Sequence, residues 1–206
     1  MNRNNILGLT GEAGAGKTAA MEILKEEFGA FLIYADKVSA ALTEPGHISY
    51  GLITEHFGSG ILLPDGRIDR KALADIVYSD PEELEILESF NHPYVKEVIS
   101  GITESVRENY GDILIVVEAA LLLECGYRDI CSEIWYISAD EAVRRQRLKE
   151  TRGYMDEKID GIMRNQQKSR EFRALCDVTI DNNGTKDELR EALAYEVRCF
   201  LERGKE

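Results

Sequence analysis

The residues of this sequence with the clearest chemical potential form a glycine-rich loop. The loop fits the pattern G-x-x-x-x-G-K-[ST] and consists of Gly11, Glu12, Ala13, Gly14, Ala15, Gly16, Lys17 and Thr18. Its glycines let the backbone curl so that successive amides face a nucleotide's phosphates. We expect Lys17 to contact the β and γ phosphates and Thr18 to bind Mg²⁺. An apolar run precedes the loop and a helical stretch follows it, which disfavours the alternative of a chance glycine turn.

Two carboxylates that follow apolar runs are candidates for catalysis. Asp36 follows the apolar run Phe31–Ile33, the second predicted strand. In an open parallel sheet the carboxyl ends of such strands face the ligand crevice. We therefore predict that Asp36 accepts the proton of an attacking hydroxyl. It could equally be the N-cap of a helix over Lys37–Leu42, where Asp is favoured. Glu118 is a weaker candidate, which would hold Mg²⁺ through water or orient Thr18.

Short apolar runs alternate with amphipathic stretches, which is typical of a parallel sheet flanked by helices. Most of the runs are rich in Ile, Leu and Val, as suits strands buried on both faces. Five strands are predicted, at Ile6–Leu9, Phe31–Ile33, Ile113–Val117, Ile134–Ile137 and Val178–Ile180. The predicted fold class is α/β, with a five-stranded parallel sheet that carries the P-loop.

Helix starts support this reading. Candidate capping boxes join Ser138 to Glu141 and Thr185 to Glu188, and Asp80 before Pro81 indicates a third start. The last start opens an amphipathic helix with apolar residues at helical spacing, namely Leu189, Leu193, Val197, Phe200 and Leu201.

The interval from Lys37 to Gly111 is too long for one crossover and contains helical segments without a clear strand. We infer an inserted helical lobe over residues 37–111, with a nucleotide-binding core formed by residues 1–36 and 112–206. A second irregular interval, Glu150–Glu157, contains Gly153 and joins two arginine-bearing helices. It predicts a lid over about residues 147–157.

Composition limits the classes of protein. With 206 residues, 44% of them hydrophobic, the chain can form one compact domain with a small lobe. It has no apolar stretch long enough for a transmembrane helix and no signal-peptide core, so we expect a cytoplasmic protein. Its four cysteines lack C-x-x-C spacing, which indicates reduced thiols rather than disulfides or zinc ligands. The oligomeric state stays open, with a monomer as the simplest expectation.

A net charge of −13 argues against broad nucleic-acid binding, which needs a basic surface. Positive charge is concentrated between Asp140 and Arg173, a segment that contains ten lysines and arginines and seven acidic residues. This segment suits either a polyanionic substrate or a solvated pair of helices, and charge alone does not decide between them.

Several further motifs occur in a specific order after the P-loop. They are Tyr34-Ala35-Asp36, Glu44-Pro45-Gly46, Asn91-His92-Pro93, Ala120-Leu121-Leu122-Leu123-Glu124 and Asp177-Val178-Thr179-Ile180-Asp181-Asn182. Over nearly the whole chain, this series resembles the dephospho-coenzyme A kinase family. The resemblance implies the fold of nucleoside monophosphate kinases and the last step of coenzyme A synthesis. In that step a transferase moves the γ-phosphoryl group of ATP, with Mg²⁺, to the ribose 3′-hydroxyl of dephospho-coenzyme A.

The same resemblance assigns roles to individual residues. Asp36 matches the family's proposed base, and the inserted lobe, in which His92 begins a His-Pro turn, would bind the acceptor. A boundary histidine bonded to the backbone is the structural alternative for His92. Glu118 and Leu121 are counted among the substrate-binding residues. The loop Asp181-Asn182-Asn183-Gly184 would pack against adenine, although Asn183-Gly184 could also be a plain turn before a helix.

The resemblance places the lid arginines in the segment Arg147 to Arg152. We expect Arg147 to stabilise charge during transfer, whereas Arg144 and Arg145 on the same helix would face water. Arg152 is an intermediate case.

The sequence departs from the family at several positions. Tyr34 stands where the family usually has Asp, Ala120 stands where it usually has Pro, and the P-loop usually reads Gly-Gly-Ile-Gly-Ser-Gly. These departures leave metal and acceptor positioning open. One alternative is a sugar or shikimate kinase of the same fold, which would have a shorter lobe. A GTPase is disfavoured because no Asn-Lys-x-Asp motif occurs. A nucleotide-binding regulator without activity is disfavoured because Lys17 and Asp36 are present.

Overall fold

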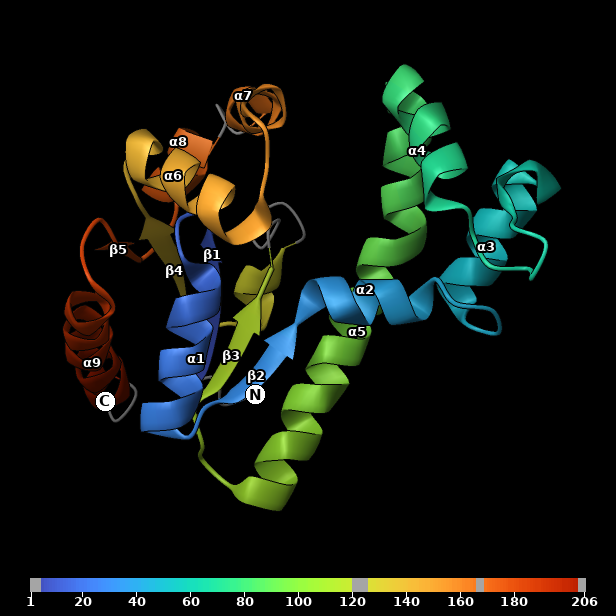
Figure 1. Ribbon diagram of the computed structural model, residues 1–206. Coiled ribbons are helices and arrows are strands. Elements are labelled where there is room, and N and C mark those ends of the chain that lie inside the picture. The colour runs from blue at the N-terminus through green and yellow to red at the C-terminus, as the bar shows by residue number, and fades with distance from the viewer. Residues whose placement is uncertain (1–4, 120–125, 166–168, 204–206) are drawn as a thin grey trace. The chain divides into compact units, whose positions relative to one another are not determined.

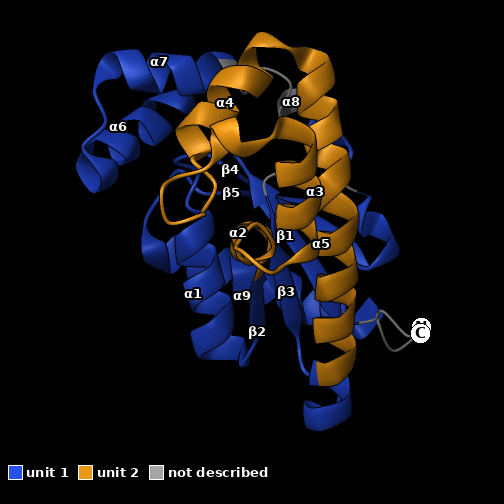
Figure 2. Cartoon of the chain, turned by 90° about the vertical axis from the view of Figure 1, so that its right-hand side faces the viewer, with its two compact units in different colours: residues 1–33, 106–206 blue, residues 34–105 orange. Residues whose placement is uncertain are grey.

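The computed structural model describes residues 5–119, 126–165 and 169–203. The chain divides into two compact units, which we call the core unit (residues 1–33 and 106–206) and the helical unit (residues 34–105), coloured separately in Figure 2.

The core unit is built on a five-stranded parallel sheet, as the alternating apolar runs predict. The strand order is β2-β3-β1-β4-β5, and the strands span Ile6–Gly11 (β1), Phe31–Tyr34 (β2), Ile115–Glu118 (β3), Glu133–Ser138 (β4) and Val178–Asp181 (β5) (Figure 1). The central strand β1 lies between β3 and β4, so the chain leaves it at a topological switch point. In open parallel sheets, ligands bind at the carboxyl ends of strands at such a point.

Helices α1 and α9 pack against each other and against the sheet of the core unit (Figure 1). The helices of this unit are α1 (Lys17–Phe28), α6 (Glu141–Arg152), α7 (Asp156–Asn165), α8 (Ser169–Ala174) and α9 (Lys186–Arg203), with a 3-10 turn η2 at Tyr127–Asp129. As predicted, α9 buries Leu189, Leu193, Val197 and Phe200. The side chain of Trp135 in β4 is fully buried and meets the ring of Phe200 edge-on, with 6.0 Å between centroids.

One of the two predicted capping boxes is confirmed and the other is wrong. At the start of α9, the Glu188 amide donates to the Thr185 hydroxyl oxygen at 3.2 Å, and the Glu188 carboxylate accepts from the Thr185 amide at 2.7 Å. Ser138 cannot cap α6, because β4 continues through Ser138, whose Cα pairs with that of Asp181 on β5. The cap position of α6 falls on Asp140 instead.

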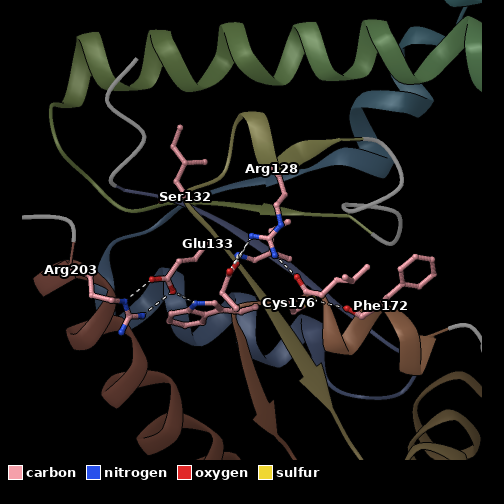
Figure 3. Close-up of polar contacts among 11 residues, drawn as sticks. Arg128, Ser132, Glu133, Phe172, Cys176 and Arg203 are labelled. Carbon is pink, nitrogen blue, oxygen red and sulfur yellow. Dashed lines mark hydrogen bonds and ion pairs between the residues drawn. The ribbon is translucent and has the colours of Figure 1, made fainter.

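A polar network fixes the amino ends of β4 and β5 (Figure 3). Arg128 donates to the Asp177 carboxylate at 2.9 Å, and the same carboxylate accepts from a backbone amide of β4. Arg203 donates to Glu133 at 2.7 Å, and Glu133 accepts from the indole N–H of Trp135 at 2.9 Å. These bonds hold the register of the two strands at the sheet edge away from the P-loop.

The helical unit contains α2 (Ala35–Leu42), α3 (Ile48–Phe57), a 3-10 turn η1 (Ser59–Ile61), α4 (Arg70–Ser79) and most of α5 (Pro81–Tyr110). Its core is an apolar cluster of Ile53, Ile61, Leu73 and Val77. The predicted start before Pro81 is confirmed, because the Asp80 carboxylate accepts from the Glu82 amide at 3.0 Å.

The prediction of a turn at His92-Pro93 is wrong, and so is the alternative of a boundary histidine. Both residues lie inside α5, a helix of 30 residues. An interior proline costs about 3 kcal/mol, because it removes a backbone hydrogen bond and crowds the preceding turn. Packing outweighs this cost, since Phe90 packs on the apolar cluster and Val95 and Ile99 are buried on the other side of the proline.

None of the helices in the described residues combines the length and the apolar character that crossing a bilayer requires.

Candidate functional site

The P-loop lies where the central strand meets the first helix of the core unit. β1 ends at Gly11 and α1 begins at Lys17, so residues 12–16 form the tight connection between them. Gly11, Gly14 and Gly16 have φ angles of +147°, +80° and +100°, which side-chain-bearing residues rarely adopt. Gly16 at the N-cap position of α1 has no side chain that could accept hydrogen bonds from the first amides of the helix. This is the arrangement that binds phosphate at a helix N-terminus.

The close approach of other elements also explains the glycines. A Cβ at Gly11 would collide with the backbone carbonyl of Ile137 on β4, and a Cβ at Gly16 would collide with the side chain of Asn182. A Cβ at Gly14 would lie 2.8 Å from the backbone oxygen of Arg144 on α6. The loop is therefore held from three sides.

Lys17 and Thr18 stand at the start of α1. The Lys17 amine donates to the carbonyl oxygen of Gly11 at 2.7 Å, which folds the side chain back over the loop. Thr18 is exposed, and within the described residues its hydroxyl has no hydrogen bond partner. An exposed hydroxyl at this position fits a ligand of Mg²⁺, which takes few protein oxygens besides phosphate oxygens and water. No cluster of three acidic, His or Cys side chains suited to a metal occurs in the described part of the chain.

Glu118 ends β3, and its Cα pairs with that of Leu9 on β1. It is half-buried at the carboxyl edge of the sheet from which the P-loop emerges. The structure thus brings Glu118 to the edge that the sequence predicts. Leu121, together with the motif from Ala120 to Glu124, lies outside the described residues.

The loop after β5, which is expected to pack against adenine, contacts the P-loop through Asn182. Asn182 is buried, and its side-chain amide donates to the carbonyl oxygen of Ala15 at 2.8 Å. Asn183 is exposed, and its side-chain oxygen accepts from the Asp140 amide at 2.7 Å. Gly184 is exposed beside it. Asn182 directly follows β5, at the carboxyl edge of the sheet, and this position is the sequence signal that marks it.

Helix α6 carries two arginines to the P-loop. Arg147 is half-buried and donates to the carbonyl oxygens of Asn182 at 2.8 Å and of Ala15 at 3.4 Å, so it lies beside the P-loop. Arg144 does not face water, and that prediction is wrong. It is 5% exposed and bonds to the P-loop, because α6 packs its backbone directly against Gly14.

Arg145 and Arg152 are more exposed than Arg144. Arg145 pairs with Glu141 at 2.8 Å and with Asp160 of α7 at 2.6 Å. Arg152 is exposed at the last position of α6, before Gly153, which takes a left-handed conformation with φ of 61°. The segment Gly153 to Met155 separates α6 from α7, so the irregular interval is shorter than the sequence predicts.

The helical unit holds a cavity of about 580 Å³, a size that suits a small-molecule ligand. Its lining includes three acidic, three basic and one amide side chain, namely Asp36, Glu44, Asp69, Arg67, Arg70, Lys71 and Asn91. Arg67 hydrogen-bonds to Asp65 and lowers the pKa of that carboxyl. Arg70 and Lys71 have no ion-pair partner among the described residues. The basic residues were missed, although an Asp cap followed by Arg-Lys signals a cationic helix start.

Asp36 lies on this cavity, in the first turn of α2. The expectation that it caps the helix is wrong, because α2 begins at Ala35 and its N-cap is Tyr34. Tyr34 has an extended backbone and the next residue is already helical, so the N-cap position falls on Tyr34, two residues before Asp36. Asp36 is exposed and has no hydrogen bond or ion pair within the helical unit.

Asn91 brings the motif that contains His92 to the same cavity. Its side-chain nitrogen donates to the Ser39 hydroxyl at 2.6 Å, and its side-chain oxygen is buried without a partner. His92 is half-buried on α5 and is not part of the lining, so Asn91 is the residue of this motif that reaches the cavity.

Comparison with known proteins gives a consistent result. Residues 5–188 match the family model described as dephospho-CoA kinase. The chain is 36% identical over 185 residues to a dephospho-CoA kinase of Geobacter sulfurreducens, covering 90% of this chain and 93% of the relative. A crystal structure from Thermus thermophilus superposes with a TM-score of 0.77 at 27% identity, over 94% of this chain and 96% of that one. A dephospho-CoA kinase from Campylobacter jejuni gives a TM-score of 0.68 at 22% identity, with the same coverage, and supports the fold.

Proposed function

The chain belongs to the dephospho-CoA kinase family, and on this premise we propose that its P-loop and the cavity of its helical unit hold the two substrates of one phosphoryl transfer. The enzyme is an ATP-dependent kinase that phosphorylates the ribose 3′-hydroxyl of dephospho-CoA and releases CoA and ADP. The observation that carries this function is the family match over residues 5–188, which includes the P-loop and all residues named around the cavity.

The nucleotide would bind through the backbone amides of residues 12–16 and the first turn of α1. Lys17 would exchange its bond to the Gly11 carbonyl for the β and γ phosphates, a short movement because its amine already lies over the loop. Thr18 would hold Mg²⁺, which when bound neutralises part of the phosphate charge. Glu118 would act from the neighbouring strand end, through water. The exposed backbone at Asn183 and Gly184 would contact adenine, because the Asn183 side chain is engaged with Asp140.

The acceptor would occupy the cavity of the helical unit. Dephospho-CoA carries a pyrophosphate, and Arg70 and Lys71 supply positive charge at the N-terminus of α4, where the helix dipole adds to it. Asn91 has a buried oxygen without a partner, so a ligand that reoriented its amide would relieve that cost. Asp36 lies on the same cavity, where it would accept the proton of the ribose hydroxyl as the bond to phosphorus forms.

Arg147 would act on the charge that grows during transfer. Its guanidinium donates to the backbone carbonyl oxygens of Ala15, Asn182 and Gly184 beside the P-loop. Each of these neutral oxygens is a weaker hydrogen-bond acceptor than a phosphate oxygen. A developing negative charge would therefore draw Arg147 away from them, which stabilises the transition state more than the bound substrate.

We also propose that the enzyme works in the cytoplasm, as a monomer. Cys131, Cys176 and Cys199 are free thiols, which suits a reducing compartment. The small-molecule substrates require neither nucleic acid nor a membrane.

ADP release from ATP and Mg²⁺ tests the acceptor. Dephospho-CoA should raise the rate well above that seen with shikimate, gluconate or nucleoside monophosphates, and the product should be CoA by mass. A rate that dephospho-CoA does not change would remove the acceptor assignment.

A further inference from the structure

The P-loop of this chain contains a carboxylate, Glu12, in the loop that is proposed to bind the phosphates. A negative charge here opposes the binding of a triphosphate, because like charges repel strongly at short range in a partly buried site. The charge therefore needs a compensating group. The structure provides Arg144, whose Nη1 lies 2.6 Å from the Glu12 Oε1.

This ion pair is shielded from solvent. The side chain of Arg144 is 6% exposed and that of Glu12 is 14% exposed, whereas the ion pair of Arg145 with Glu141 has exposures of 32% and 62%. Solvent screens the exposed pair but screens the buried pair much less. Arg144 therefore reduces the electrostatic repulsion between Glu12 and the phosphates of a bound nucleotide.

Arg144 also contacts the loop by hydrogen bonding. Its Nε donates to the carbonyl oxygen of Ala13 at 3.1 Å, and its Nη2 lies 2.8 Å from the sulfur of Met163 on α7. The backbone of Arg144 packs on Gly14, as described above. One side chain therefore joins the loop carboxylate, a loop carbonyl and α7.

We propose that Arg144 is a positioning residue of the nucleotide site, which neutralises Glu12 and holds residues 12–14 in the curve that points their amides at the phosphates. This rests on the proposed binding of ATP by the P-loop. A purely structural ion pair is the competing explanation. Buried pairs add little net stability against uncharged replacements, so stability alone gives no strong reason for the pair.

The two explanations differ for single and double substitutions. Arg144→Gln removes the positive charge beside Glu12, so the Kd for ATP should rise about tenfold or more, the effect of one added net negative charge near the phosphates in a partly buried site. Glu12→Gln removes the repulsion and should leave the Kd for ATP unchanged or lower. The double variant E12Q/R144Q restores the charge balance, so its Kd should return to within about threefold of the parent. Arg145→Gln is the matched control, and its Kd for ATP should equal that of the parent.

The experiment is isothermal titration of each full-length variant with ATP and Mg²⁺ in the absence of acceptor, together with its melting temperature. A structural pair predicts that both single variants lose melting temperature while the folded protein binds ATP normally. Arg144→Gln binding within twofold of the parent would overturn the proposal. If that variant does not fold, the double variant decides, and a Kd more than about tenfold above the parent would overturn the charge argument. A parent that binds no ATP would overturn the nucleotide site itself, and this inference with it.

Discussion

The substitution Asp36→Asn separates a catalytic role of Asp36 from a structural one. The surroundings of Asp36 limit how much stability the protein can lose when the carboxylate is replaced. Asp36 is exposed in the first turn of α2, does not cap it, and has no bond within the helical unit. Replacing it by Asn therefore removes only the attraction between a carboxylate and a helix N-terminus, about 0.3–1 kcal/mol. For a chain of this length that corresponds to a melting temperature lower by a few degrees at most.

Loss of a general base has a larger effect on the rate. Such a base contributes roughly a hundredfold to ten-thousandfold, which is about 2.7–5.5 kcal/mol of activation free energy. Asn has nearly the same size but cannot take the proton. We therefore expect Asp36→Asn to lose at least about two orders of magnitude in kcat while its Kd for ATP stays near that of the parent.

The assay is ADP release at saturating ATP and dephospho-CoA, with circular dichroism to follow melting and titration to follow ATP binding. Asp75→Asn is the matched control, because Asp75 is exposed on α4 and does not line the cavity. Its turnover should equal that of the parent. Turnover of Asp36→Asn within a few-fold of the parent would refute the reasoning and remove Asp36 from the mechanism.

Four further substitutions test the remaining roles. Lys17→Ala should lower turnover by at least about a hundredfold with an unchanged melting temperature, because its amine serves the phosphates rather than the core; normal turnover would contradict the P-loop assignment. Arg147→Ala should lower kcat by about tenfold or more and change the Kd for ATP by less, as single-turnover rates and titration would show. Full turnover in Arg147→Ala together with a defect in Arg152→Ala would mean that Arg152 is the lid residue. His92→Ala should raise the KM for dephospho-CoA and leave that for ATP unchanged, since its neighbour Asn91 lines the cavity; equal changes in both constants would indicate a structural role.

The sheet and the P-loop could be predicted because their signals are local. Runs of Ile, Leu and Val buried on both faces report strands directly, and the glycines of the P-loop sit at φ angles that demand them. The start of α9 was predictable for the same reason, because Thr185 and Glu188 bond to each other across one turn.

The wrong predictions concern residues whose environment is set by distant parts of the chain. Arg144 reads as a surface residue in an arginine-rich helix, and its burial depends on the packing of α6 against Gly14. His92-Pro93 reads as a turn, and it lies in a helix because apolar packing on both sides outweighs the cost of the proline. The cavity of the helical unit draws Asp36, Arg67 and Asn91 from separate segments, which no local pattern joins.

The burial of Trp135 gives the protein an internal optical reporter. It is the single tryptophan of the chain, and it lies in β4 of the core unit with its indole N–H bonded to Glu133. Fluorescence excited selectively in tryptophan therefore follows the core unit alone, whereas far-ultraviolet circular dichroism sums the helices of both units. Recorded on the same sample during denaturation, the two signals would coincide if the units unfold as one and would separate if the helical unit melts first.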